Sequence, residues 1–303
     1  MRKRGATMNN LEQILNKLPQ NIRGPILELP QQIRNTLEEI RMKTGSDVRI
    51  LAGNQEIIVA LKDHHLVTKE DLDTILNNLL DYSYYAYEEE LAKGYITIEG
   101  GHRVGVCGRA VMKQGRVSLI KEISSLNIRR SREIIGAAEQ VLPHVLDKEG
   151  APRNTLIVSP PKCGKTTLLR DLARLLSYKG FKIGLCDERS EIAGTYQGKP
   201  SYDLGPRTDV LDGCPKAEGM AMLIRAMSPD AVVTDEIGKQ EDIAAVESAL
   251  CAGVSILTTI HGSSREDIAA SSIGPLVDKG VFSRIIFLSN DPVTGSICEV
   301  LHA

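Results

Sequence analysis

The sequence predicts an α/β fold with a parallel-rich sheet over residues 151–303, preceded by a smaller α+β domain over residues 1–150. Three observations support this prediction. The 303 residues suffice for about two domains. Short apolar runs alternate with amphipathic helical stretches after residue 152, a pattern typical of parallel strands joined by crossover helices. Before residue 147, short strands and helices follow one another without that alternation, and residues 147–152 form a polar linker between the two patterns.

Composition excludes several classes of protein. Hydrophobic residues make up 42% of the chain, which is enough for packed cores. The 37 basic and 39 acidic side chains nearly cancel, so a globally basic nucleic-acid coat is excluded, although a local basic patch is not. No apolar run approaches the ~18 residues of a membrane span, and no apolar stretch follows the basic residues 1–4, so we expect a cytoplasmic protein without a signal peptide. The six cysteines form no CxxC pair, which argues against a zinc site.

The N-terminal region begins with apolar residues at helical spacing after Asn10, and Pro19 ends this predicted helix. A second short helix is predicted near residues 37–45, and a capped helix begins at Thr68. Glycine-bounded apolar runs predict strands at 48–51, 57–61, 95–98, 103–107 and 117–120. A last helix is predicted from about Arg132 to Val145.

The C-terminal region contains five apolar runs with the length and composition of buried strands. They are predicted at 155–158, 182–186, 231–235, 255–259 and 285–288. Amphipathic helices separate them, which predicts a mostly parallel sheet.

The strongest chemical motif joins the first of these strands to the following helix. Its nine residues are Ser159, Pro160, Pro161, Lys162, Cys163, Gly164, Lys165, Thr166 and Thr167. Backbone N–H groups at a helix N-terminus attract phosphate oxygens, and a strand–loop–helix context is required of a phosphate-binding loop. The motif therefore predicts an ATP site in which Lys165 contacts the β- and γ-phosphates and Thr166 offers its hydroxyl to Mg²⁺.

The loop departs from the usual G-x-x-x-x-G-K-[ST] pattern at its first position, where Ser159 replaces glycine. A positive φ at this serine would cost about 1 kcal/mol more than at glycine. An isolated Gly-Lys-Thr sequence at a helix start is common, but the flanking apolar strand and amphipathic helix favour the phosphate-loop interpretation.

Polar side chains follow three other predicted strands. Asp235 and Glu236 end one, an acidic cluster that includes Glu191 follows another, and His261 ends a third. Because ligands bind at the carboxyl ends of parallel strands, these residues are predicted to share the nucleotide site. Asp235 would hold Mg²⁺ through water, Glu236 would polarise the attacking water, and His261 would lie beside the γ-phosphate. The alternative for the acids is helix capping, and a single histidine is usually structural.

Residues 101–132 form a basic stretch opposed only by Glu122. Its cations are Arg103, Arg109, Lys113, Arg116, Lys121, Arg129, Arg130 and Arg132. A solvated face is one interpretation. An arginine finger that reaches the phosphates of a neighbouring subunit, and a surface for nucleic acid or an anionic membrane, are the others.

The C-terminal motifs resemble those of the type II/IV secretion ATPase superfamily. The matching segments are Ser159–Thr167, Asp187–Glu191, Thr234–Glu241 and Thr258–Gly262. This resemblance implies a RecA-like P-loop ATPase core, a homo-hexamer, and catalytic roles for Lys165, Glu236, His261 and Glu191. It also places an N-terminal domain against the nucleotide face, which favours Arg103 as the finger.

Longer strings, some within and some outside these motifs, resemble the stage III sporulation protein AA family. They include residues 95–105, 123–129, 187–194 and 234–238, and the resemblance extends from about Leu18 to Leu288. It implies a Mg²⁺-dependent motor that energises a secretion-like channel between mother cell and forespore. The implied partners are membrane proteins of the same operon, through which the protein would associate peripherally with the membrane on the mother-cell side.

Two alternatives use the same ATPase core. One is a nucleic-acid translocase that uses the basic stretch, although the resemblance does not favour nucleic acid as a partner. The other is a nucleotide-controlled scaffold with little turnover. The family usually has glycine where Lys162 stands, which adds a cation near the predicted phosphates.

Overall fold

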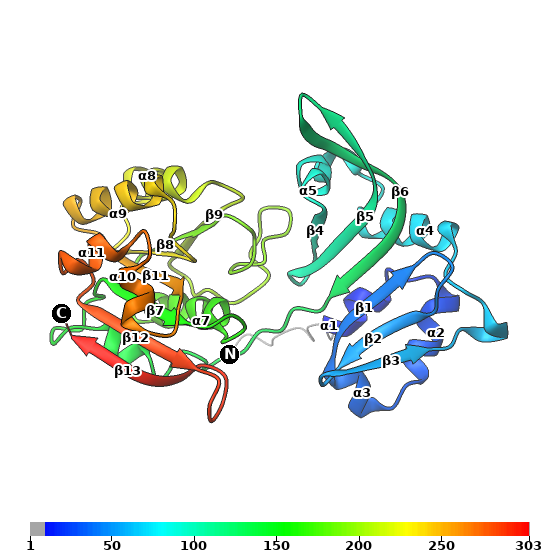
Figure 1. The fold of residues 1–303 in the computed structure, drawn as a ribbon, viewed down its shortest axis with the longest axis horizontal. Helices are drawn as coiled ribbons and strands as arrows, with labels where there is room; N and C mark the ends of the chain where they lie inside the picture. The colour runs from blue at the N-terminus through cyan, green and yellow to red at the C-terminus, as the bar shows by residue number, and fades with distance from the viewer. Residues whose placement is uncertain (1–9, 303) are drawn as a thin grey trace. The chain divides into compact units, whose positions relative to one another are not determined.

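The computed structural model describes residues 10–302 and divides the chain into two units, one ending at Arg132 and the other beginning at Glu133 (Figure 1). This division lies earlier than the boundary predicted at residue 150. The reason is that Ala138, Val141 and Val145 are buried in the core of the second unit. The Ala138 N–H also donates to Asp171 Oδ2 over 2.8 Å, which ties this segment to the second unit.

The helix predicted from Arg132 to Val145 is mostly wrong. Only α6, Leu142–Val145, is helical, and turns precede it. Gly136 adopts a φ of 91°, which no α-helix contains, so the backbone turns there instead of continuing in a helix.

The first unit is built on a six-stranded antiparallel sheet in the order β3-β2-β1-β6-β5-β4. Its strands are β1 Leu37–Lys43, β2 Val48–Ala52, β3 Gln55–Val59, β4 Tyr95–Ile98, β5 His102–Lys113 and β6 Arg116–Arg129. The helix predicted near residues 37–45 is wrong, because β1 occupies this segment. Buried Ile40 and Met42 alternate with Arg41 and Lys43, and this period of two fits a strand with one buried face.

Short helices accompany this sheet and supply the other half of its core. They are α1 Asn10–Leu15, α2 Gln20–Glu28, α3 Gln31–Thr36, η1 Lys62–His64, α4 Lys69–Leu79, η2 Tyr84–Tyr87 and α5 Glu88–Ala92. The predicted cap of α4 is confirmed, since Thr68 and Asp71 form a reciprocal capping box. Buried His102 accepts a hydrogen bond from the Ser131 N–H at Nδ1 over 3.0 Å, and this bond fixes the end of the unit to β5.

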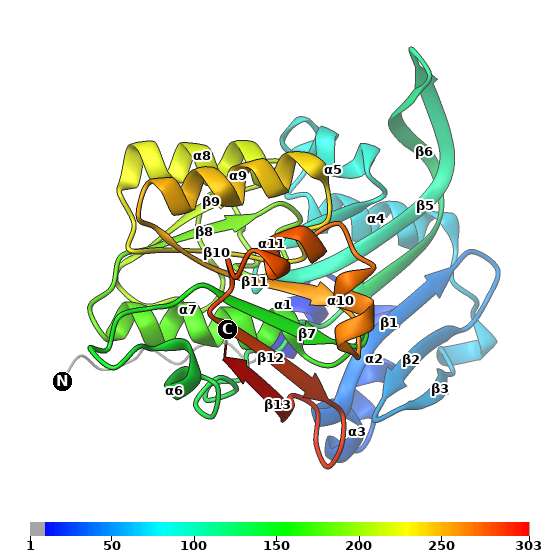
Figure 2. The same cartoon turned by 60° about the vertical axis from the view of Figure 1, so that its left-hand side comes forward.

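Strands β5 and β6 are much longer than predicted. They pair from Arg103 and Arg129 out to Lys113 and Arg116, so their outer halves extend past the neighbouring strands as a two-stranded ribbon (Figure 2). A bulge at Gly108 separates the ribbon from the sheet. A Cβ at Gly108 would lie 2.5 Å from the Lys121 carbonyl oxygen, so only glycine allows the two strands to approach this closely.

The second unit is a seven-stranded sheet in the order β13-β12-β7-β11-β10-β8-β9. Its strands are β7 Thr155–Ser159, β8 Ile183–Asp187, β9 Thr208–Asp212, β10 Ala231–Thr234, β11 Ser255–His261, β12 Arg284–Ser289 and β13 Ser296–His302. All neighbours are parallel except β12 and β13. The five strands predicted from the sequence are confirmed, and β9 and β13 are additional.

Helices cover both faces of this sheet, as the two core clusters show. One face packs against α6 and α7, Lys165–Tyr178, and the other against four further helices. Those helices are α8 Lys216–Met227, α9 Gln240–Cys251, α10 Arg265–Ala269 and α11 Gly274–Asp278. The predicted α/β fold with a parallel-rich sheet is therefore confirmed. Within residues 10–302, no helix is both long and apolar enough to cross a membrane.

Candidate functional site

The loop between β7 and α7 has the strand–loop–helix context that a phosphate site requires. Ser159 ends β7 with a buried side chain and is not among the residues with positive φ. The cost expected for serine at this position is therefore not incurred. Positive φ occurs instead at Lys162, 61°, and at Gly164, 79°. Gly164 also faces the Thr294 methyl group, from which a Cβ would lie only 3.3 Å away.

Lys165 begins α7 and points back over the loop. Its Nζ donates to the carbonyl oxygens of Ser159 and Pro160, each over 3.1 Å, and lies 3.3 Å from Ser159 Oγ. The same ammonium lies 2.8 Å from His261 Nδ1. Burial lowers the pKa of Lys165, while the Glu236 carboxylate opposes this shift. A cation is thus held at the entrance of the helix, where phosphate oxygens bind.

His261 connects Lys165 to Glu236. An ammonium group only donates, so the His261 Nδ1 accepts from Lys165 and the proton of the neutral ring lies on Nε2. Nε2 then donates to Glu236 Oε1, 2.5 Å away. The Glu236 N–H donates to Thr259 Oγ1 over 3.0 Å, which fixes the backbone beyond β10. Three residues predicted to be catalytic therefore form one hydrogen-bonded chain.

The register of the sheet explains why His261 lies within hydrogen-bonding distance of both Lys165 and Glu236. His261 pairs directly with Ser159 because β11 lies parallel to β7, and β10 follows on the other side of β11. The carboxyl ends of the three strands consequently meet at one edge, as the sequence analysis expected.

Asp235 is a buried carboxylate next to Glu236. Burial raises its pKa, and the nearby Lys216 ammonium opposes this shift. Asp235 Oδ1 lies 3.4 Å from Lys216 Nζ and has no hydrogen-bond partner among the described residues. A buried carboxylate oxygen with unused acceptor capacity fits the hard oxygen ligand that Mg²⁺ prefers.

Glu191 lies in the turn that follows β8, and hydrogen bonds to Asp187 hold this turn in place. Asp187 accepts hydrogen bonds from the N–H groups of Glu191, Ile192 and Ala193 over 2.8–3.0 Å. Burial nevertheless raises the pKa of Asp187 to about 6. Asp187 therefore shapes the turn that carries Glu191, and Glu191 lies close enough to raise the pKa of Asp235.

One cavity of about 660 Å³ brings most of the predicted residues together. Its wall includes Lys162, Cys163, Gly164, Lys165, Thr166, Thr167, Glu191, Asp235, Glu236 and His261. Cys163 is buried in the core, so its backbone rather than its thiol is available to a ligand. Ser159, Pro160 and Pro161 are not part of the wall, although two of them accept hydrogen bonds from Lys165.

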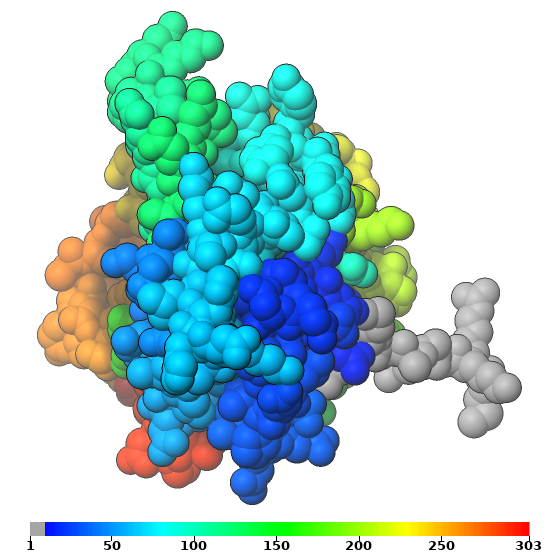
Figure 3. All heavy atoms as spheres, turned by 90° about the vertical axis from the view of Figure 1, so that its right-hand side faces the viewer, coloured from blue at the N-terminus to red at the C-terminus, as the bar shows by residue number. Residues whose placement is uncertain are grey.

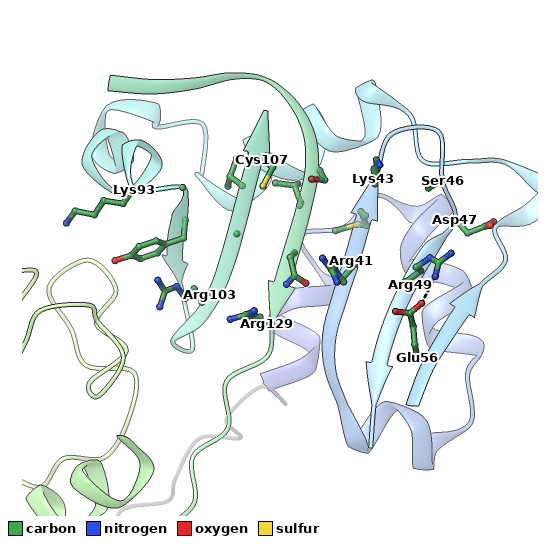
Figure 4. A pocket seen from close by; sticks show the side chains of 18 residues that line it. Arg41, Lys43, Ser46, Asp47, Arg49, Glu56, Lys93, Arg103, Cys107 and Arg129 are labelled. Carbon is green, nitrogen blue, oxygen red and sulfur yellow. Dashed lines mark hydrogen bonds and ion pairs between the residues drawn. The ribbon is translucent and has the colours of Figure 1, made fainter. Parts of the chain in front are cut away.

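Arg103 belongs to the first unit and lies in a different cavity, of about 710 Å³, on the open face of the sheet (Figure 4). Its guanidinium stacks on the Tyr95 ring, 3.7 Å from the centroid. Arg103 is also directly opposite Arg129 on β6. Figure 4 shows Arg41, Arg49, Lys43 and Lys93 around the same cavity.

Comparison with known proteins identifies the family of this chain. The family described as sporulation stage III, protein AA, matches residues 8–302. The chain belongs to this family. It is 42% identical to the stage III sporulation protein AA of Bacillus subtilis (strain 168), over 96% of this chain and 94% of the relative.

Solved structures place the fold of this sporulation family member. The Legionella pneumophila ATPase DotB is similar with a TM-score of 0.56 at 15% identity, over 95% of this chain and 78% of that one. The pilus retraction motor PilT, solved with bound ADP, is similar with a TM-score of 0.59 at 16% identity, over 85% of this chain and 75% of that one. The chain therefore shares the fold of these two structures, which is consistent with the predicted RecA-like core.

Several residues in or beside the cavity of this family member were not predicted from the sequence. Lys216 bridges Asp235 and Glu188, with Nζ 2.8 Å from Glu188 Oε2, and is almost fully buried. Thr294 and Gly295 reach the phosphate loop from the turn between β12 and β13. No motif marks these residues, because they come together only through the sheet order. Thr259 could have been found, since it lies two positions before His261 at the same strand end.

The conformation of Lys162 leads to a prediction about stability. A left-handed φ costs a lysine about 1–2 kcal/mol, of which the greater flexibility of unfolded glycine cancels part. Lys162→Gly should therefore raise the free energy of unfolding of the second unit by about 0.5–1 kcal/mol. Urea denaturation measures this change. Lys162→Ala also removes the cation but keeps the strained φ, so an equal gain in that variant would contradict the explanation.

Proposed function

We propose that this sporulation protein is a Mg²⁺-dependent ATPase whose hydrolysis energises a secretion-like channel between mother cell and forespore. The single observation that carries the proposal is the hydrogen-bonded chain from Lys165 through His261 to Glu236, which lines the phosphate-loop cavity. It joins a phosphate-binding cation to a carboxylate that can accept a proton. These are the two elements that hydrolysis of a phosphoanhydride needs from side chains.

Each element of the cavity has a distinct role in this proposal. The N–H groups of the loop and Lys165 bind the phosphates, and Lys162 adds a further positive charge. Glu236 accepts the proton of the attacking water, and His261 orients the carboxylate through its Nε2–H. Glu191 adds negative charge beside Asp235, which favours cation binding there.

Thr166 and Asp235 are the residues that would hold Mg²⁺, since both line the cavity and Asp235 Oδ1 retains acceptor capacity. When bound, the ion neutralises charge that develops on the β- and γ-phosphates. The Lys216 ammonium, 3.4 Å from the same oxygen, favours the ionised carboxylate that binding of a cation would require.

The assembly we propose is a homo-hexamer on the mother-cell side of the membrane. Its partners would be membrane proteins of the same operon, through which it would associate with the membrane. The similarity to the pilus retraction motor PilT supports a motor in this setting.

Replacing the proton acceptor tests the proposed reaction. Glu236→Gln should reduce turnover by about 10²-fold or more, because glutamine accepts the His261 hydrogen bond but cannot take a proton from water. Steady-state phosphate release measures turnover, and titration of labelled ATP should show unchanged affinity.

A matched control is Glu241→Gln on α9, which removes an exposed acid near the same strand end. It should leave both quantities unchanged. Full hydrolysis by the Glu236 variant would exclude Glu236 from the reaction. Tight ATP binding with negligible turnover by the unaltered protein would instead indicate a nucleotide-controlled scaffold.

A further inference from the structure

The ribbon formed by the outer halves of β5 and β6, residues 109–121, has two chemically different faces. Cross-strand partners in an antiparallel pair lie on the same face. Ala110 pairs with Ile120 and Met112 with Val117, so one face is entirely apolar. The opposite face is basic around a small apolar centre; its pairs are Arg109–Lys121, Val111–Leu119 and Lys113–Arg116.

Three of the four side chains on the apolar face of the ribbon are exposed. Met112 is 58% exposed and Val117 is 37% exposed, and Ala110 is exposed as well. Figure 3 shows the ribbon, in green, standing clear of the rest of the first unit. A two-stranded ribbon with an uncovered apolar face is only marginally stable in water. An exposed apolar surface of this kind is typical of a binding surface.

The charged side chains on the opposite face of the ribbon indicate the kind of partner. Arg109 pairs with Glu122 over 3.4 Å, but no acidic side chain among residues 10–302 pairs with Lys113, Arg116 or Lys121. The ribbon therefore carries a net positive charge beside an apolar surface. Lys113 and Arg116 lie on the opposite face at the tip, next in sequence to Met112 and Val117, and long cationic side chains there can reach lipid phosphates while the apolar face lies in the interface of an anionic bilayer.

The bulge at the base of the ribbon indicates that its projection is a fixed feature. Gly108 lies where a Cβ would meet the carbonyl oxygens of Lys121 and Glu122 at 2.5 and 2.9 Å, and Glu122 has a φ of 48°. Bulges bend a strand pair and increase its twist, so the ribbon leaves the sheet in a defined direction. A rigid projection presents its tip to a surface without an ordering cost at the moment of contact.

We propose that the ribbon of residues 109–121 binds directly to an anionic lipid bilayer, with Met112 and Val117 at the acyl boundary and Lys113 and Arg116 at lipid phosphates. A nucleic-acid partner is less suitable, because the ribbon has no aromatic side chain on which bases could stack. The outer edges of both strands carry unpaired backbone groups at the tip, so the ribbon enters only the interfacial layer and not the hydrocarbon core.

Vesicle binding tests the proposal with the full chain and without nucleotide, so its outcome does not depend on ATP hydrolysis. The protein should sediment with vesicles of phosphatidylglycerol in phosphatidylcholine and not with phosphatidylcholine alone. Lys113→Gln combined with Arg116→Gln should weaken binding by roughly 30-fold, as the loss of two cations near an anionic surface predicts. Met112→Ser combined with Val117→Ser should weaken it by about tenfold or more.

Two matched controls distinguish the ribbon from general charge and hydrophobicity. Lys148→Gln removes an exposed cation outside the ribbon, and Ile58→Ser removes an aliphatic side chain that is 55% exposed on β3. Neither should change binding by more than twofold. Circular dichroism and thermal unfolding of each variant confirm that the ribbon substitutions leave the fold intact.

The absence of tryptophan from the sequence allows a direct measurement of insertion. Met112→Trp makes residue 112 the single indole, which is excited apart from the eight tyrosines. Its emission should shift to shorter wavelength with anionic vesicles, whereas Ile58→Trp should not shift. Equal shifts in both variants, no vesicle binding, or binding that survives both double substitutions would each overturn the proposal. The same would follow if single-stranded DNA or RNA, rather than vesicles, were bound through the ribbon cations.

Discussion

Replacing Lys165 with alanine is expected to abolish ATP binding at nucleotide concentrations that saturate the unaltered protein. Hydrogen bonds to charged groups contribute about 1.5–3 kcal/mol each, and Lys165 would supply one to the β- and one to the γ-phosphate. The loss amounts to a fall in affinity of at least ~10²-fold. The variant also loses the ammonium that joins Ser159 and Pro160 to His261, so the loop is less well ordered before ATP arrives.

Titration with labelled ATP measures this effect, and ADP, which keeps the β-phosphate, should lose affinity too. Lys179→Ala is the matched control, because Lys179 is an exposed lysine at the other end of α7. Thermal unfolding shows whether either variant is still folded. ATP affinity within threefold of the original in a folded Lys165→Ala protein would remove Lys165 from the phosphate site.

Much of the cavity beside the β7–α7 loop could be predicted from the sequence, because a parallel sheet brings its strand ends together. Four polar strand ends near residues 159, 187, 235 and 261 predict one site, and the register of His261 opposite Ser159 explains why two of them meet. The prediction did not require the strand order, since every parallel strand ends at the same edge. It failed to include Lys216 and Thr294, whose positions depend on which strands are neighbours.

Errors in the first unit have a different cause. Residues 37–43 contain leucine, isoleucine and methionine at spacings that fit either a short helix or a strand, and the pairing of β1 with both β2 and β6 decides in favour of the strand. Of the β5–β6 ribbon, only residues 117–120 were predicted as a strand, and the outer half of β5 was missed because its side chains pack against no second layer. Local apolar periodicity therefore gave no sign of where the pairing ends.

Loop strain also could not be located from the pattern alone. Because Ser159 replaces the usual glycine, the sequence suggested backbone strain at Ser159. In the structure Ser159 is the last residue of a strand, and the left-handed conformation occurs at Lys162. The consensus records which positions usually carry glycine, but the φ angle at each position depends on how this loop packs.

The basic cavity of the first unit leads to the prediction with the largest expected effect on turnover. Arg103 and Arg129 are direct cross-strand partners; Arg129 also pairs with Glu39 over 3.2 Å, and Arg103 stacks on the Tyr95 ring. Cations outnumber acids around this cavity, which fits an anion-binding site, and we propose that the anion is the phosphate group of ATP in a neighbouring subunit. Arg103→Ala should then reduce turnover by ~10³-fold or more while ATP binding is largely retained.

Arg109→Ala is the control for this substitution, because Arg109 lies on the same strand but on the ribbon. If Arg103 only formed a solvated face, its replacement would change stability by about 0.5 kcal/mol or less and leave turnover unchanged, as we expect for Arg109. A nucleic-acid role for Arg103 would instead reduce the salt dependence of nucleic-acid binding by about one unit. Phosphate release, ATP titration and binding at several salt concentrations distinguish these three outcomes.

Mixing two inactive variants determines whether Arg103 acts between subunits. In a ring assembled from Arg103→Ala and Lys165→Ala subunits, some interfaces contain an intact phosphate loop facing an intact Arg103. Because each such interface has every group that the reaction needs, turnover should recover partially in mixed rings and remain absent in either pure ring. Labelled subunits confirm that mixing has occurred. A lack of recovery in demonstrably mixed rings would mean that Arg103 serves its own subunit or takes no part in hydrolysis.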